Sequence, residues 1–254
     1  MKEVNKEHQK QFFDFTFEFE ARKSVSKFYA VVKSSTEYYE KFLLSNCHSK
    51  KVLEYGCGTG SYAFLLTKCG ANVVGIDISE VAIKLSKERA KKEGLKDILF
   101  LAMDAEAMQF EDSSFDIICG TGILHHLNID RALRELARVL KPEGKAIFIE
   151  PMGYNPLINL FRKFTPHLRT RDEHPLTVKD LSFMEKFFHK VQCEFFHLFS
   201  LLAVPFRNSR IFPSLLKVLD NFDNNLFRWI PLVRLFAWAV VIILEKPKKA
   251  DLRK

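Results

Sequence analysis

Two adjacent histidines, His125 and His126, carry side chains suited to proton transfer. The pKa of a histidine lies near neutral pH, so its neutral ring can take a proton from a reacting group. Both follow the predicted strand 115–120, and ligands of open α/β sheets bind beyond the carboxyl ends of the strands. Glu150, at the end of a later strand, could orient a substrate or one of the histidines. The alternative is that the pair packs against the next helix.

Asp172, Glu173 and His174 form a second group of titratable side chains, in a polar stretch bounded by prolines. The stretch leaves the same edge of the sheet, and loops on a rigid scaffold often carry functional residues. Two carboxylates beside a histidine could bind a metal ion, but adjacent residues lack the spacing of a ligand set, so we expect no metal there. Ion pairs with Arg169 or Arg171 are the structural alternative.

Glycines at every second position follow the apolar segment 52–55. Gly56, Gly58 and Gly60 permit a tight turn and a close approach of the backbone to a ligand. Helically spaced apolar residues from Tyr62 onward predict a helix after this turn. The N-terminus of such a helix carries free N–H groups and the positive end of its dipole. The segment therefore predicts a strand, a turn and a helix that bind a nucleotide-like ligand.

Acids stand at the ends of the next two predicted strands. Asp77 follows Gly60 by 17 residues and could accept two hydrogen bonds from a ribose diol. Asp104 lies just past segment 98–103, where it could meet an adenine amino group. A dinucleotide fingerprint would also need a glycine at position 61, which is Ser61, so that alternative is not favoured.

These segments belong to an alternation of apolar strands and amphipathic helices. A helix is predicted over 131–140, and Lys141-Pro142-Glu143-Gly144 is expected to end it. Another helix is expected to begin near Thr177. The pattern is typical of an α/β fold with a mainly parallel sheet. The predicted strands are 52–55, 72–79, 98–103, 115–120, 145–151, 191–198 and 238–247.

The order of these motifs resembles the class I S-adenosylmethionine-dependent methyltransferases, and most closely their ubiquinone/menaquinone-methyltransferase-like group. Several motifs in order are a stronger signal than any one of them. The resemblance implies a Rossmann-like sheet of seven strands, the last antiparallel, with helices on both faces and S-adenosyl-L-methionine as cofactor. It covers roughly residues 50–151 and rests on E-x-G-x-G-x-G at 54–60, the acid at 77, Asp104-Ala105, L-H-H-L at 124–127 and L-K-P-E-G at 140–144.

The resemblance also implies roles for single residues. Glu54 would lie near the methionine amino group, Asp77 would hold the ribose, and Asp104 would face adenine. An N-terminal helical segment would fold over the site, so that tyrosines 29, 38 or 39 could line the pocket. The alternative is that these tyrosines pack on the sheet. The expected cofactor contacts are Tyr29, Glu54, Gly56, Gly58, Gly60, Asp77, Ile78, Asp104, Ala105 and Gly120.

Composition favours a cytoplasmic globular protein. The 254 residues suffice for one α/β domain with additions. The five cysteines are odd in number and lack paired spacing, which favours reduced thiols. The charged N-terminus does not fit a signal peptide, and no uncharged apolar run is long enough to cross a membrane.

Basic and aromatic residues concentrate in the C-terminal part. Residues 151–254 hold 17 basic and 9 acidic residues, whereas residues 1–150 hold 22 of each, so the net charge of +8 lies in the C-terminal part. That part also contains 13 of the 25 phenylalanines and both tryptophans. Such a segment predicts a lipid-like partner or peripheral contact with an anionic membrane; an ordinary core with a solvated basic face is the alternative. Nucleic acid is not the expected partner, because the Asp/Asn-Pro-Pro-aromatic motif of amino-group methyltransferases is absent.

We interpret residues 49–254 as one methyltransferase domain, preceded by an N-terminal helical lid at 1–48. An active-site loop at 152–180 and a helical insertion at 200–236, between strands six and seven, are expected within it. The resemblance implies methyl transfer to a small or lipid-like acceptor. Alternatives are an RNA or protein methyltransferase that uses the basic C-terminal face, and a cofactor-binding module without catalysis. The candidate catalytic residues are His125, His126, Glu150, Asp172, Glu173 and His174.

Overall fold

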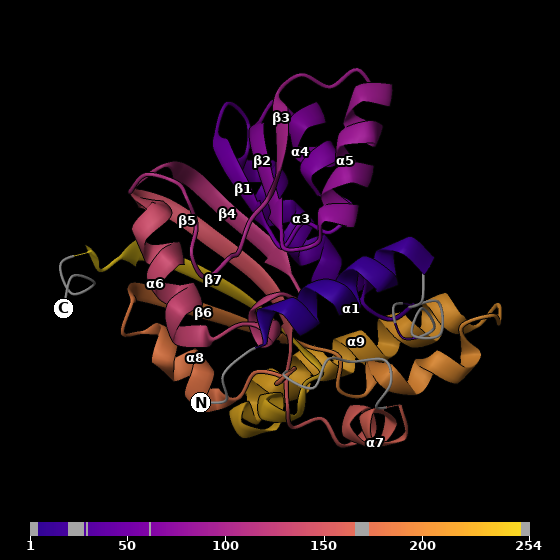
Figure 1. Ribbon diagram of the computed structural model, residues 1–254. Helices are drawn as coiled ribbons and strands as arrows, with labels where there is room; N and C mark the ends of the chain where they lie inside the picture. The colour runs from indigo at the N-terminus through magenta and orange to yellow at the C-terminus, as the bar shows by residue number, and fades with distance from the viewer. Residues whose placement is uncertain (1–4, 20–27, 29, 61, 166–172, 250–254) are drawn as a thin grey trace.

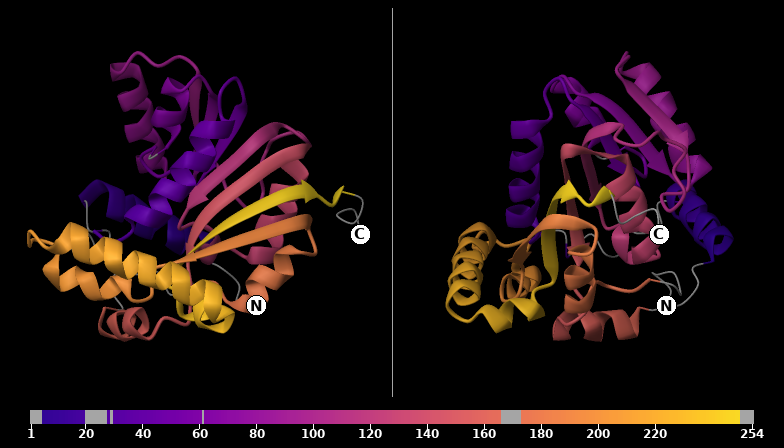
Figure 2. Two further views of the ribbon diagram at one scale, coloured as in Figure 1. Left: turned by 180° about the vertical axis from the view of Figure 1, so that it is seen from behind. Right: turned by 90° about the vertical axis from the view of Figure 1, so that its left-hand side faces the viewer.

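The computed structural model describes residues 5–19, 28, 30–60, 62–165 and 173–249, and within them a seven-stranded sheet forms the centre of the protein (Figures 1 and 2). The strand order is β3-β2-β1-β4-β5-β7-β6. β7 is antiparallel to both β5 and β6, and the other described pairs are parallel. The strands are β1 (Lys51–Tyr55), β2 (Asn72–Asp77), β3 (Ile98–Ala102), β4 (Phe115–Thr121), β5 (Leu140–Pro151), β6 (Phe188–Phe196) and β7 (Ala239–Pro247).

Helices cover both faces of this sheet (Figures 1 and 2). The described α-helices are α1 (Lys6–Phe19), α3 (Lys33–Asn46), α4 (Ala63–Lys68), α5 (Glu80–Lys92), α6 (Ile129–Val139), α7 (Pro156–Phe164), α8 (Val178–Met184) and α9 (Phe212–Trp229). Short 3₁₀ helices are η2 (Leu124–His126), η4 (Ser200–Phe206) and η5 (Pro231–Phe236). α3, α4 and α5 pack on one face, and α6 and α8 pack on the other.

The apolar runs in the central strands follow from this two-sided cover. Successive side chains of a strand point to opposite faces. Leu53 and Ile118 therefore pack toward α6, whereas Val52 and Ile117 pack toward α3 and α4. Strands covered on both faces read as continuous apolar segments. The predicted α/β class, with seven strands and an antiparallel last strand, is confirmed.

The start of β5 differs from the prediction. Residues 141–144 do not form a helix end outside the sheet, because α6 ends at Val139 and β5 already begins at Leu140. Leu140 pairs with Phe115, and the register then shifts before the next pair. Pro142 lacks an N–H group for a regular ladder, which accounts for an irregular strand start. β6 also lies earlier than the predicted 191–198, because the chain turns at His197 with a φ of 66°.

The stretch 152–180 was expected to be a loop, but it contains α7. Asn155 begins this helix, since its side chain accepts a hydrogen bond from the N–H of Ile158 at 3.0 Å. Pro156 occupies the first turn, where its missing N–H costs little. α8 begins as predicted, because Thr177 and Asp180 form a reciprocal capping box.

The insertion at 200–236 is helical, as predicted, and a buried acid ties it to the sheet. The carboxylate of Asp223 accepts hydrogen bonds from the backbone N–H groups of residues 198–200 at 2.8–3.0 Å. The adjacent His197 is buried, and its Nε2 lies 2.8 Å from the Oγ of Ser35 in α3. Burial lowers the pKa of His197 to about 3, so the ring is neutral and joins the insertion to α3 without a buried charge.

The described N-terminal residues are helical, in α1 and α3. Tyr39 is fully buried and packs edge-on against Tyr62, with ring centroids 5.0 Å apart. Tyr38 is partly exposed beside Phe196. Both tyrosines therefore agree with the alternative that they pack on the sheet. Tyr29 lies outside the described residues.

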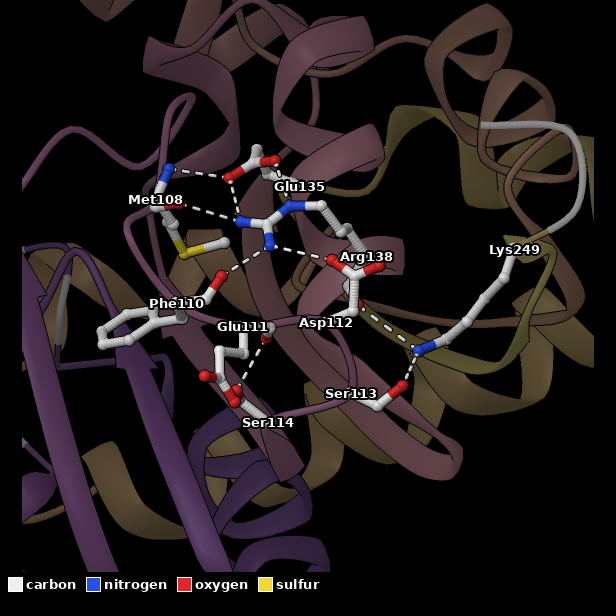
Figure 3. A network of polar contacts seen from close by, with 9 residues as sticks. All are labelled: Met108, Phe110, Glu111, Asp112, Ser113, Ser114, Glu135, Arg138 and Lys249. Carbon is white, nitrogen blue, oxygen red and sulfur yellow. Dashed lines mark hydrogen bonds and ion pairs between the residues drawn. The ribbon is translucent and has the colours of Figure 1, made fainter. Parts of the chain in front are cut away.

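Arg138 ties the connection between β3 and β4 to α6 (Figure 3). Its guanidinium donates to the carbonyl oxygens of Met108 and Phe110 at 2.8 and 2.6 Å. It also forms two hydrogen bonds with the carboxylate of Glu135, at 2.7 and 2.8 Å. Glu135 in turn accepts the N–H of Met108 at 2.7 Å. The hydrogen bonds with Glu135, and after them the one with Asp112, raise the pKa of Arg138, although burial lowers it. The network fixes the chain that follows Asp104.

We expect Arg138→Ala to destabilise the fold clearly. Two carbonyl groups and a carboxylate would lose their charged donor, and hydrogen bonds to charged groups contribute about 1.5–3 kcal/mol each. Urea unfolding followed by circular dichroism should show a loss of roughly 2–4 kcal/mol. Arg134→Ala is the matched control, because the exposed pair of Arg134 with Asp130 should contribute less than about 1 kcal/mol. Equal losses in both variants would contradict the anchoring role.

Candidate active site

The turn between β1 and α4 depends on glycine. Gly56, Gly58 and Gly60 have φ angles of 70°, 51° and 79°. A Cβ on Gly56 would lie 2.7 Å from the side chain of Ile123, and one on Gly60 would lie 2.5 Å from Phe64. Any larger residue would be strained there, so these positions keep the turn tight and its backbone close to the space above the sheet edge.

Glu54 fixes the start of α4. Its carboxylate accepts the N–H of Tyr62 at 2.9 Å and the N–H of Ala63 at 2.8 Å. The residue is only 2% exposed. These N–H groups have no partner within the helix, so Glu54 satisfies donors that would otherwise be buried unpaired. The predicted contact between Glu54 and a methionine amino group stays a prediction.

Asp77 clamps the glycine turn from the neighbouring strand. Its Oδ2 accepts the N–H of Gly58 at 2.7 Å, and its Oδ1 accepts the N–H of Ser79 at 2.9 Å. Burial raises the pKa of Asp77, and the two backbone hydrogen bonds oppose this rise. Each carboxylate oxygen has a second lone pair, so Asp77 can also accept hydrogen bonds from ligand hydroxyls.

Asp77 and Asp104 line a cavity of about 140 Å³ between the sheet edge and α1. Lys6 lies 3.2 Å from Asp104, and together with Gln9 and Phe13 it brings α1 to this cavity. The sequence gives no signal for these three residues, because a helix that packs on a sheet shows the same pattern. The predicted cofactor residues that line the cavity are Gly56, Gly58, Asp77, Ile78, Asp104 and Ala105.

Three described residues from the predicted cofactor set, Glu54, Gly60 and Gly120, are not among those that line this cavity. A Cβ on Gly120 would lie 2.7 Å from the carbonyl oxygen of Tyr55, so tight strand packing accounts for that glycine. The next residues, Thr121 and Gly122, line the cavity instead.

A larger cavity of about 430 Å³ adjoins the first, since Thr121 and Gly122 line both. This volume lies in the range of small-molecule sites, which combine apolar walls with a few polar groups. The apolar and aromatic lining includes Phe28, Tyr62, Ile149, Ile158, Phe161 and Trp238, and the polar lining includes Ser35, Thr36, His125, Glu150, Arg162 and Glu173.

Glu150 orients His125 in the wall of the larger cavity. Its Oε2 lies 2.7 Å from the Nδ1 of His125, and its Oε1 accepts the N–H groups of Ile123 and Leu124 at 2.9 and 2.8 Å. Both residues are buried, with exposed fractions of 1% for Glu150 and 7% for His125. A proton on Nδ1 of the neutral ring leaves Nε2 as the basic nitrogen. The predicted alternative that Glu150 orients a histidine therefore agrees with this geometry.

The protonation of Glu150 controls this arrangement near neutral pH. Burial raises the pKa of Glu150 to about 7, although hydrogen bonds from the backbone N–H groups of residues 124, 123 and 125 lower it. Above that pH the ionised carboxylate accepts the Nδ1 proton of His125. Below it the carboxyl group is protonated and no longer favours that tautomer.

The structure brings His126 and Glu173 beside His125. One ligand atom from each of the three lies within 4.8 Å of the others, and the two imidazole rings are 4.0 Å apart. The N–H of His174 donates to the carbonyl oxygen of His125 at 2.9 Å, while its side chain is exposed. Asp172 lies outside the described residues. Two imidazoles and a carboxylate can move a proton, and they could also hold a divalent metal ion.

The smaller cavity fits the chemistry of S-adenosylmethionine. Asp77 suits a ribose diol, the glycine turn allows close approach of the backbone, and Asp104 adds a further acceptor. The cavity is nevertheless smaller than the roughly 300 Å³ at which small-molecule sites begin. It adjoins the larger cavity at Thr121 and Gly122, and ion pairs of Lys6 with Asp104 and Glu106 hold α1 beside it.

Comparisons with known proteins agree with this geometry. A family described as "Methyltransferase domain" matches residues 53–148. The demethylmenaquinone methyltransferase of Lactococcus lactis subsp. lactis is 37% identical over 103 residues, which are 39% of this chain and 41% of that protein.

Two solved structures, each with S-adenosylhomocysteine bound, share the fold at low identity. Phosphoethanolamine N-methyltransferase 2 of Haemonchus contortus has a TM-score of 0.64 at 18% identity, over 91% of this chain and 59% of that chain. Geranyl diphosphate C-methyltransferase of Streptomyces coelicolor A3(2) has a TM-score of 0.60 at 13% identity, over 84% and 79%.

The match to curated relatives covers part of each protein. For three of these relatives the alignment spans 41%, 41% and 53% of their length. The family match contains the glycine turn, both cofactor-side acids and the histidine pair. Residues 53–148 therefore match a methyltransferase domain, and part of the chain is similar to ubiquinone/menaquinone-type methyltransferases.

Proposed function

We propose that this protein transfers a methyl group from S-adenosylmethionine to a hydrophobic, lipid-like acceptor in the larger cavity. The observation that carries the proposal is the junction of the two cavities at Thr121 and Gly122. The acids suited to a nucleoside lie on one side of this junction, and the His125–Glu150 pair lies on the other. The bound cofactor supplies a methyl carbon attached to a positively charged sulfur.

The protein's own groups have two tasks in this reaction. The first is to hold the acceptor atom in line with the methyl group, and positioning alone can supply much of the rate. The second arises when the acceptor atom carries a proton, which must leave during transfer. We assign that proton to Nε2 of His125, with Glu150 as the positioning residue. Glu173 also lines the larger cavity, where it could bind the polar group of the acceptor, whereas His126 lines the smaller cavity.

The lining of the larger cavity supports a hydrophobic acceptor. Phe28 packs against Phe161 and Trp238, with ring centroids 4.7 and 6.2 Å away. Arg162 adds a cation to this aromatic wall, where it could meet an anionic substituent. Two similar proteins, a demethylmenaquinone methyltransferase and a geranyl diphosphate C-methyltransferase, are named for acceptors with isoprenoid chains. An oxygen, carbon or nitrogen atom of such an acceptor would receive the methyl group.

We also infer a cytoplasmic location. The five cysteines are free thiols, as is usual for proteins of a reducing compartment. Among the described residues, no helix is long and apolar enough to cross a membrane.

Asp77→Ala should weaken binding of S-adenosylhomocysteine. Loss of the ribose acceptor should cost about 1.5–3 kcal/mol, which corresponds to roughly a 10- to 150-fold increase in Kd. Isothermal titration calorimetry measures this change, and circular dichroism checks that the variant is folded. Asp97→Ala, which removes an exposed acid before β3, should bind like the wild type. A folded Asp77→Ala protein with unchanged affinity would remove Asp77 from the cofactor site.

The His125–Glu150 pair should give turnover a characteristic pH dependence. With a panel of isoprenoid quinols and alkylphenols as acceptors, kcat/KM should rise with pH through about 7, because only ionised Glu150 holds the basic tautomer of His125. Glu150→Gln keeps an oxygen for Ile123 and Leu124 but should lower kcat by about 10²–10⁴-fold, as should His125→Ala.

The controls for that experiment separate catalysis from folding. Both variants should bind S-adenosylhomocysteine with nearly wild-type affinity, and His189→Ala, at an exposed position, should keep wild-type turnover. Nitrogen NMR of labelled histidine should show a changed His125 tautomer in Glu150→Gln. Wild-type turnover in the His125→Ala protein would overturn the assigned base.

Treatment with a chelator distinguishes proton transfer from metal chemistry at the same three side chains. The proposed base requires no metal, so purified protein treated with EDTA should retain its turnover. Loss of turnover that added Mn²⁺ or Zn²⁺ restores would instead assign His125, His126 and Glu173 as ligands. Elemental analysis before and after treatment identifies any ion removed.

A further inference from the structure

α9 carries apolar side chains on two opposite sides. Leu216 and Phe227 are buried and point toward the rest of the protein. Val218, Phe222 and Trp229 recur at intervals of four and seven residues, about half a helical turn away from the buried pair, and form a second stripe. A surface helix normally carries polar residues on the side that faces water. The outer stripe therefore has the composition of a buried face without a covering element in the described chain.

The exposure of this stripe is large. Trp229 is 77% exposed and Val218 is 64% exposed. The apolar surface continues into η5, where Leu232 is 75% and Phe236 is 48% exposed. α9 contacts both η4 and η5, and these elements extend along one side of the molecule (Figures 1 and 2). Contiguous exposed apolar patches of this kind mark interaction sites more often than isolated apolar residues do. We name the outer stripe of α9 and η5 the apolar ridge: Val218, Phe222, Trp229, Leu232 and Phe236.

The charges around the apolar ridge have one sign. Segment 200–236 contains five basic residues and two acidic ones. Both acids, Asp220 and Asp223, face inward; Asp223 is buried by its backbone hydrogen bonds, and the side chain of Asp220 is 18% exposed. Lys217 and Arg228 are exposed, and each directly precedes a ridge residue in the sequence. Their side chains therefore lie about a quarter of a helical turn to one side of the stripe. The exposed bases of the segment are Arg207, Arg210, Lys217 and Arg228.

We propose that the apolar ridge and its flanking bases dock the protein on an anionic lipid bilayer. Trp, Leu and Phe suit the boundary between headgroups and acyl chains, while Lys and Arg suit anionic headgroups. A second copy of this chain fits less well, because it would bring one basic face against another. The inference deepens the proposed function and rests on it for one point: a lipid-like acceptor would already reside in that bilayer.

The position of α7 connects this surface with the larger cavity. Ile158 of α7 packs in one cluster with Leu201 and Leu216 of the insertion. Ile158 and Phe161 also line the larger cavity. Exposed apolar residues of α7, such as Phe164 at 73%, add to the apolar surface at this end of the molecule. A docked orientation would thus place the cavity wall near the membrane from which the acceptor comes.

Vesicle binding of the full chain tests this proposal. The probes are vesicles of pure phosphatidylcholine and vesicles that also contain phosphatidylglycerol, at low and high salt. We expect partitioning onto the anionic vesicles only, weakened by salt because exposed charges are screened. Trp229→Ser with Leu232→Ser should lower the partition coefficient by about tenfold or more. Neutralising the four exposed bases to Gln should lower it by up to roughly a thousandfold.

Matched variants and a spectroscopic readout localise the contact. Leu85→Ser with Lys84→Gln should leave partitioning unchanged, because α5 packs on β2 and β3, whereas α9 contacts β6 at the opposite edge of the sheet. Vesicles should shift the tryptophan emission of the wild type to shorter wavelength, and Trp229→Phe should abolish that shift. Calorimetry with S-adenosylhomocysteine on the same samples distinguishes a failure of membrane docking from a failure of the proposed methyl transfer, because the ridge variants should bind S-adenosylhomocysteine with wild-type affinity.

Three results would overturn the docking proposal. One is no binding of the wild type to anionic vesicles at low salt. Another is equal binding by the wild type and both ridge variants, which would place the contact elsewhere. The third is self-association, seen by analytical ultracentrifugation, that Trp229→Ser with Leu232→Ser abolishes while vesicles remain unbound. Each of these leaves cofactor binding and methyl transfer to be judged by their own measurements.

Discussion

The turn after β4 depends on one buried carboxylate, that of Glu150 at the end of the neighbouring strand β5. The parallel pairing of β4 and β5 brings their carboxyl ends side by side, so Glu150 can accept the backbone N–H groups of Ile123 and Leu124. Buried N–H groups without a partner would each cost about 1–3 kcal/mol. The same carboxylate orients His125. Structure and proposed chemistry therefore share one group, whose ionisation near pH 7 affects both.

A second carboxylate has a parallel role on the other side of the sheet centre. Asp77 ends β2 and accepts the N–H of Gly58 in the turn after β1. β1 lies between β2 and β4. The chain runs from β1 outward to β2 and β3 and then crosses back to β4 on the other side of β1, so the strand order reverses there. Ligands of open α/β sheets bind at such a switch point. The two clamped turns face each other there, and the two cavities meet between them.

The sequence predicted this central part well because its signals are local. Apolar runs defined the strands, and alternate glycines defined the turn. The acids at the strand ends line the smaller cavity, and their contacts with a cofactor stay a prediction. The prediction of helices and loops was weaker where contacts between distant residues determine the local structure. Leu140, for example, pairs with Phe115, so that β5 begins earlier than predicted. Gly120 illustrates the same limit, since a glycine required by strand packing looks like one required by a ligand.

The acceptor side was harder to predict because it is assembled from distant segments. Phe28, Arg162 and Trp238 meet around one cavity, although more than 200 residues separate the first from the last. Their identity as lining residues depends on how α7 and the insertion pack, which no short motif encodes. The basic and aromatic composition of the C-terminal part was visible in the sequence. The structure adds that Asp220 and Asp223 of the insertion turn inward, while Trp229 and the bases Arg207, Arg210, Lys217 and Arg228 are exposed.

The most direct test of the account is a crystal structure of the protein with S-adenosylhomocysteine bound. The account predicts ribose hydroxyls on the carboxylate of Asp77, adenine beside Asp104, and the sulfur at Thr121 and Gly122, facing the larger cavity and His125. A sulfur that faces away from that cavity, or a ligand bound elsewhere on the protein, would contradict the proposed path of methyl transfer.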